Sequence, residues 1–97
     1  MKFYVKIHKD KMHEVVAIAD EDVIGKTFEE GELCITISER FYKGELKDEM
    51  EVKKIFMEED NINIAGNKVV DLAIKSGIIS EKNVIKIQGV KHAQIVR

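Results

Sequence analysis

The sequence predicts an α+β fold, in which an antiparallel or mixed sheet of four to five strands carries two helices packed mainly on one face. Segments near both ends alternate polar and apolar residues, which is the period of strands with one buried face. Two segments in the middle, 48–59 and 67–76, repeat apolar residues at helical spacing. Strands grouped at the ends with helices between them favour α+β over alternating α/β, and 97 residues suffice for one domain, 1–97.

The first half of the chain supplies three of the expected strands. Residues 2–8 alternate strictly, and a polar turn joins them to the continuous apolar run 14–19, so the two should form a hairpin. Asp20 is expected to cap a very short helix that Gly25 ends. Residues 27–31 form a charged connection before a third strand at 32–37, after which Ser38 caps a turn.

The second half supplies both helices and the remaining strands. Asp48 followed by Glu51 has the spacing of a capping box, which predicts a helix over 48–59. Residues 60–66 alternate, but the segment is too short to be assigned as a strand. A helix over 67–76 should end at Gly77, and strands are expected at 83–88 and 92–97. The residues expected to share the core are Phe3, Val5, Ile7, Ile35, Ile37, Val52, Ile55, Phe56, Leu72, Ala73, Ile85 and Ile87.

Composition excludes several classes of protein. The chain is 44% hydrophobic and 35% charged, which excludes a disordered protein. Its one cysteine, Cys34, has no partner for an internal disulfide, which indicates a reducing, cytoplasmic setting. The longest apolar stretches are about five residues against the roughly 20 of a spanning helix, so no membrane role is expected.

Charge is unevenly distributed along the chain, although its net value is only −2. Residues 1–13 carry +3 and residues 61–97 carry +4, whereas the segments 14–32 and 33–60 carry −6 and −3. If the first and last strands were neighbours, their outward side chains would form one basic surface able to attract phosphates, with Tyr4 available to stack on a base. The residues of this expected nucleic-acid- or partner-binding surface are Lys2, Tyr4, Lys6, His8, Lys86, Lys91 and Arg97. A solvated sheet face with lysines protecting an edge would show the same pattern.

The acidic middle is the counterpart of these basic ends. Glu29, Glu30 and Glu32 stand close together, as do the consecutive residues 58–60. They are expected to be solvated, or to dock a basic partner such as a ribosomal protein.

Metal and thiol chemistry are not expected. The possible soft ligands His8, His13, His92 and Cys34 lack the close spacing of zinc motifs, so neither a metal nor another cofactor is predicted. Cys34 and His92 are the one possible Cys–His pair, but Cys34 lies in the middle of a strand, where burial would make it inert. The segment 25–27 echoes the end of a phosphate-binding loop without its upstream glycine.

One acid–base site remains conceivable. His92 could act as a general base, with Asn63 and Gln94 orienting a substrate. The same residues serve equally well as turn and cap residues that bond to the backbone. A concave polar pocket in which the three converge would favour the enzyme, and a flat face with segregated charge would favour a binding module.

The chain resembles an archaeal family catalogued as domain of unknown function 424. The segments that carry the resemblance are Lys6-Ile7-His8, Gly25-Lys26-Thr27-Phe28, Phe41-Tyr42 with Gly44-Glu45, Asn63 with Gly66, and Gly89-Val90 followed by His92-Ala93-Gln94. The resemblance implies an archaeal source and, by association, a translation-linked role. The function expected is therefore a non-catalytic module that binds RNA, a ribonucleoprotein or a protein partner; a small enzyme using His92 is the alternative.

Overall fold

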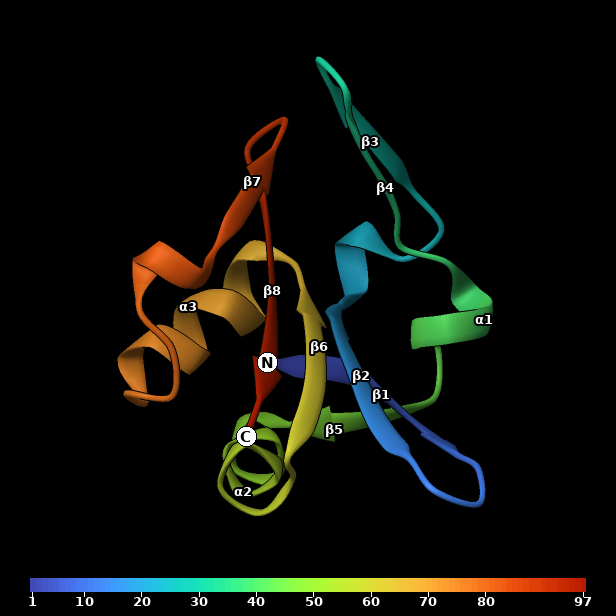
Figure 1. The fold of residues 1–97 in the computed structure, drawn as a ribbon, viewed down its shortest axis with the longest axis vertical. Helices are drawn as coiled ribbons and strands as arrows, with labels where there is room; N and C mark the ends of the chain where they lie inside the picture. Colours follow the sequence, from blue (N-terminus) through green and yellow to red (C-terminus); the bar gives the residue numbers. More distant parts are fainter.

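Eight strands in two sheets, three α-helices and two 3-10 turns make up the computed structural model, which describes residues Met1–Arg97 (Figure 1). The strands are β1 (Lys2–Lys9), β2 (Glu14–Asp20), β3 (Thr27–Glu30), β4 (Leu33–Thr36), β5 (Glu45–Asp48), β6 (Asn61–Ala65), β7 (Ile85–Ile87) and β8 (Val90–Val96). The helices are α1 (Glu39–Tyr42), α2 (Glu49–Glu58) and α3 (Asn67–Lys75), with the 3-10 turns η1 (Glu21–Val23) and η2 (Glu81–Asn83).

The main sheet is mixed and has six strands in the order β5-β1-β2-β6-β8-β7, and β3 and β4 form a separate two-stranded sheet. Every pair in the main sheet is antiparallel except β2 with β6, which is parallel. The α+β class and the hairpin of the first two strands are therefore confirmed. The predicted count of four to five strands and two helices was too low, because β3, β5, β6 and the one-turn helix α1 were not assigned.

The two faces of the main sheet are covered differently. Helices α2 and α3 pack on one face over the larger core, which contains Phe3, Val5, Val16, Ile18, Val52, Phe56, Ile62, Ile64, Val69, Val70, Leu72, Ala73, Ala93 and Ile95. The opposite face presents Ala17, Ala19 and Ala65, whose small side chains let η1 and α1 approach closely. Figure 1 shows α3 and α1 on opposite sides of the sheet.

The predicted single core is divided between these faces, and two of its members are exposed. Ile37 and Tyr42 belong to the smaller core on the α1 side. Ile7 is 57% exposed, because it follows the part of β1 that pairs with β5. Ile85 is 49% exposed: its register opposite His92 puts it on the α1 side at the end of the sheet, away from α2 and α3.

Helix ends largely follow the sequence, with one correction. Asp48 and Glu51 form the predicted capping box of α2, and the Ser38 side chain accepts a hydrogen bond from the Phe41 N–H. Asp20, however, makes no cap to η1. Its carboxylate instead accepts the N–H groups of Lys68 at 2.8 Å and Val69 at 2.9 Å, so it caps α3 from the end of β2.

Gly66 is required where Asp20 meets α3. Its φ is +118°, and a Cβ there would lie 2.4 Å from the Asp20 carboxyl carbon. Any other residue would therefore displace the capping carboxylate, and the parallel pairing of β2 with β6 is what brings the two together.

Candidate partner-binding groove

A groove of about 530 Å³ lies between β4, α1 and the β7–β8 end of the main sheet. We call it the hairpin groove, and its lining residues are Leu33, Cys34, Ile35, Thr36, Ser38, Phe41, Tyr42, Ile85, Ile87 and His92. Seven of the ten are hydrophobic. Two large apolar side chains, Leu33 at 50% and Ile85 at 49%, are exposed on its opposing walls.

The first wall is the β3–β4 hairpin, which projects beyond one end of the main sheet (Figure 1). Phe28 pairs with Ile35 across the two strands, and Phe28 packs against the smaller core. The hairpin is also tied to the turn between β7 and β8 through Gln88. The Glu29 N–H donates to Gln88 Oε1 at 3.0 Å, and the Gln88 N–H donates to a Glu30 carboxylate oxygen at 2.8 Å.

The second wall is the β7–β8 hairpin, which presents Ile85, Ile87 and His92. Its two-residue turn has positive φ at Gln88 (51°) and Gly89 (78°), the geometry of a tight type I′ turn. Pairing of Ile85 with His92 and of Ile87 with Val90 directs these side chains to the α1 side of the sheet. In Figure 1 the two hairpins extend side by side from the same end of the molecule.

Helix α1 contributes Phe41 and Tyr42, and residues of β1 hold it against the sheet. The Lys6 ammonium donates to the Arg40 carbonyl at 2.6 Å, and His8 Nε2 lies 2.7 Å from the Phe41 carbonyl. The His8 ring also stacks on Phe41 with 4.5 Å between ring centroids. Burial raises the pKa of Tyr42 to about 12, so its hydroxyl stays protonated.

The structure separates the predicted basic surface into two parts. Strands β1 and β8 are not neighbours, because β2 and β6 lie between them. Lys6 and His8 are engaged with α1, and Tyr4 lies under the Lys43 ammonium at 5.9 Å. These residues and Lys2 alternate with the buried Phe3 and Val5, so they face the α1 side of the sheet.

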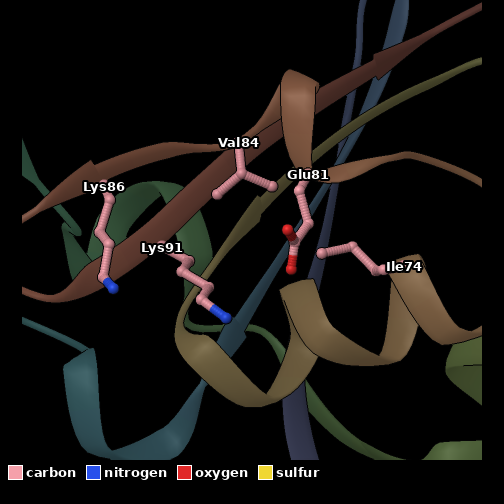
Figure 2. Close-up of a pocket in the computed structure, with 5 residues that line it drawn as sticks. All are labelled: Ile74, Glu81, Val84, Lys86 and Lys91. Carbon is pink, nitrogen blue, oxygen red and sulfur yellow. The ribbon is translucent and has the colours of Figure 1, made fainter.

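The carboxy-terminal cations lie elsewhere. Lys86 and Lys91 line a pocket of about 260 Å³ on the α3 side together with Ile74, Glu81 and Val84 (Figure 2). The Lys91 ammonium bonds the Asp71 carboxylate at 2.7 Å, which raises the pKa of Lys91. Arg97 donates to the carbonyls of Glu59 and Phe56, so it satisfies the end of α2. Because β1 and β8 are not neighbours, the condition for a single basic surface is not met.

The residues of the conceivable acid–base site share a sheet face without forming one pocket. His92 is half-buried in the hairpin groove, and burial lowers its pKa, so the ring is neutral at physiological pH. Asn63 and Gln94 pair one step further along the sheet, where Gln94 Nε2 donates to Asn61 Oδ1 at 3.4 Å. Neither residue lines the hairpin groove.

The thiol was predicted to be buried, and that prediction is wrong. Cys34 is exposed and lines the hairpin groove together with His92. Exposure follows from the position of β4 at the edge of a two-stranded sheet, a context that alternation within 32–37 does not reveal. No group of three or more His, Cys, Asp and Glu side chains is arranged to hold a metal ion.

Comparison with known proteins places the chain in a family. The family model described as "Protein of unknown function (DUF424)" matches residues 7–97. The chain belongs to this family. A crystal structure of an uncharacterized conserved protein from Methanopyrus kandleri, an archaeon, is similar to this chain with a TM-score of 0.78 and 27% sequence identity. The match covers 100% of this chain and 95% of that one.

The resemblance to the DUF424 family stated from the sequence is thus confirmed. No curated protein matches the chain. No helix in this member of the family is both long and apolar enough to cross a membrane.

Sequence reasoning missed the groove because its walls were read as core. Leu33, Ile35, Ile85 and Ile87 alternate as a buried face would. In the structure these strands are short, since β4 has four residues and β7 has three, whereas strands were expected over 32–37 and 83–88. Strands this short, each next to a two-residue turn, belong to the rim of a fold more often than to its centre.

Proposed function

We propose that this protein is a non-catalytic, cytoplasmic binding module that docks a segment of a protein partner in the hairpin groove. The observation that carries the proposal is the groove itself, about 530 Å³ in volume and lined mainly by apolar side chains. Exposed apolar side chains gathered in one concave surface are a mark of binding sites.

The charge beside the groove favours a basic partner. Glu29, Glu30 and Glu32 stand at the tip of the β3–β4 hairpin, and all three are exposed. Carboxylates beside an apolar groove attract lysine or arginine next to the apolar residues of a docked segment. They repel phosphates, so RNA is the less favoured occupant.

The separation of the lysines supports the same choice. Lys6 is bonded to α1 and Lys91 to Asp71, and the two lie on opposite faces of the sheet. A basic protein that carries an apolar segment, such as a ribosomal protein, fits both the groove and the translation-linked expectation for the family.

An enzyme that uses His92 remains the second candidate, because a neutral imidazole in a groove has the protonation state of a general base. The absence of Asn63 and Gln94 from the groove lining weighs against it. Under the binding proposal, His92→Gln should change affinity for a docked segment only several-fold, whereas an enzyme would lose its activity.

The experiment selects peptides on the purified protein and then tests them against variants. A displayed library with apolar residues at alternate positions and lysines at one end is enriched on the wild type, and a library with glutamates at that end serves as the comparison. Selected peptides should bind with micromolar affinity by fluorescence anisotropy, weakening as salt rises.

Variants of the groove provide the test of location. Ile85→Asp should abolish binding, whereas Met57→Asp, at a side chain 71% exposed on α2, should not change it. Failure to enrich lysine-flanked peptides, equal binding by the Ile85 variant, or micromolar binding of single-stranded RNA that is lost in Lys6→Ala would contradict the proposal.

A further inference from the structure

We propose that the docked segment adds to the open edge of β4 as an antiparallel strand, so that its backbone as well as its side chains is recognised. This inference rests on the proposed function and specifies how the partner is held. It predicts a partner that is extended in the groove, with apolar residues at every second position.

The hydrogen-bond pattern of the β3–β4 hairpin shows which backbone groups are free. The Ile37 N–H donates to the Lys26 carbonyl at 2.9 Å, so this pair is hydrogen-bonded. Hydrogen-bonded and non-hydrogen-bonded pairs alternate along an antiparallel ladder, so the bonded pairs are Phe28 with Ile35 and Glu30 with Leu33. In the pairs Glu29 with Cys34 and Thr27 with Thr36 the backbone groups are not bonded to each other, and only the side chains are in contact.

The contact with Gln88 confirms this alternation independently. The N–H of Glu29 donates to the Gln88 side chain, so it points away from β4 as the pattern requires. By the same pattern the N–H and C=O groups of Cys34 and Thr36 point away from β3. Strand β4 has no second neighbour, and no turn or loop hydrogen bond engages either N–H.

The groove runs along this open edge. Four consecutive residues of β4, Leu33 to Thr36, line the groove, and no residue of β3 does. A groove on one face of the hairpin would expose only alternate residues. The outward N–H and C=O groups of Cys34 and Thr36 are therefore available to a chain lying in the groove, which β-strand addition requires.

The other residues that line the groove indicate which side chains the added strand should carry. Ile85, Ile87 and Phe41 line the same groove as β4, so apolar side chains at alternate positions of the added strand would contact them. The tip of the hairpin, with Glu29, Glu30 and Glu32, lies at the Leu33 end of β4. An antiparallel strand runs from the Thr36 end toward this tip, so its basic residues should follow its apolar ones.

The experiment separates backbone recognition from side-chain recognition. Cys34→Pro removes the outward N–H of β4 without removing a bond of the β3–β4 ladder, and Cys34→Ala keeps that N–H as the matched control. Peptides from the selection above are measured against both variants. Cys34→Pro should weaken binding about tenfold relative to Cys34→Ala, which removes the same groove side chain but keeps the N–H.

A second arm alters the peptide and leaves the protein intact. N-methylation at alternate backbone nitrogens should weaken binding in one register and spare it in the other, because only every second N–H faces β4. A peptide with its lysines before the apolar residues should bind less well than one with lysines after them. Circular dichroism and thermal unfolding check the fold of Cys34→Pro. If this variant loses its β3–β4 hairpin, the methylated peptides alone test strand addition.

The outcomes distinguish this inference from the proposed function. If Ile85→Asp abolishes binding while Cys34→Pro and all methylated peptides bind normally, the groove docks side chains only and strand addition is wrong. If Ile85→Asp also binds normally, both proposals fail. A concentration-dependent dimer that Cys34→Pro abolishes, with no peptide binding, would show that the occupant of the edge is a second copy of this chain.

Discussion

Asp20 shows how one carboxylate joins segments far apart in the sequence. It is 3% exposed and accepts two backbone N–H groups at the start of α3, nearly 50 residues later. The sequence offers an acidic residue before a short helical turn, which indicates a local cap. Only the parallel pairing of β2 with β6 shows that the cap serves a different helix.

Replacing this carboxylate should destabilise the protein substantially. Asp20→Ala leaves two N–H groups at the start of α3 without acceptors and should lower the free energy of unfolding by about 2–3 kcal/mol. Urea unfolding followed by circular dichroism measures it. Asp22→Ala, at an exposed acid two residues away, should change stability by less than about 0.5 kcal/mol. Equal effects would show that the cap contributes little.

Asp20 should also make the stability of the protein depend on pH. Burial raises the pKa of Asp20 above its ordinary value of 3.8, although its two backbone hydrogen bonds oppose the shift. The folded state therefore binds the Asp20 proton more tightly than the unfolded state does. The contribution of Asp20 to stability falls as pH rises from the pKa of the unfolded state to that of the folded state. Asp20→Asn does not titrate, so the stability of wild type relative to this variant should fall as pH rises above 3.8 and level off once Asp20 is ionised in the folded state as well. A difference that rises with pH would contradict the shift.

Helix α2 illustrates what local sequence can establish about an element. Its capping box, its amphipathic spacing and its bounds agree with prediction to within a residue at each end, because all three depend on residues close in sequence. The central strand β6 was missed for the opposite reason. One face of β6 packs under α2 and α3, and the other carries Asn61 and Asn63, which produces the alternation. Five alternating residues are too few to predict a strand from the local sequence alone.

The α2 interface should contribute strongly to stability. Phe56 is completely buried in the larger core, so Phe56→Ala should lower the free energy of unfolding by about 3–5 kcal/mol. Met57 is its neighbour on the helix and is 71% exposed, so Met57→Ala should cost less than about 0.5 kcal/mol. Urea titrations of both variants make the comparison. Losses of similar size would place Phe56 outside the core.

At the scale of the molecule, the sequence indicated the fold class but could not indicate which segments meet. The order of the strands decides whether two basic ends form one surface, and β2 and β6 separate them. The hairpin groove depends on the same information, since β4 and β7 are about 50 residues apart, and Gln88, which follows β7, bonds Glu29 and Glu30 of β3. Long-range placement of this kind leaves little trace in local periodicity.

The distribution of histidines leads to a prediction about metals for the whole protein. His8 is bonded to α1, His13 lies beside Asp10 in the exposed turn, and His92 faces the hairpin groove with Cys34. Purified protein should therefore contain no stoichiometric zinc by elemental analysis, and a chelator should leave its melting temperature unchanged. The prediction would be wrong if the protein contained close to one equivalent of zinc and a chelator lowered its melting temperature, because a structural metal site contributes directly to folding.

The separate β3–β4 sheet has a consequence for cooperativity. Its ladder is internal, so the hairpin can open while all six strands of the main sheet stay paired. In native-state hydrogen exchange, the amides of Phe28 and Ile35 should exchange through this local opening, and those of β2 and β6 only through global unfolding. The free protein would then behave as two cooperative units of unequal stability. A strand bound along β4 and packed against Ile85 and Ile87 would couple these two units. Binding in the groove would then slow the hydrogen exchange of the hairpin amides.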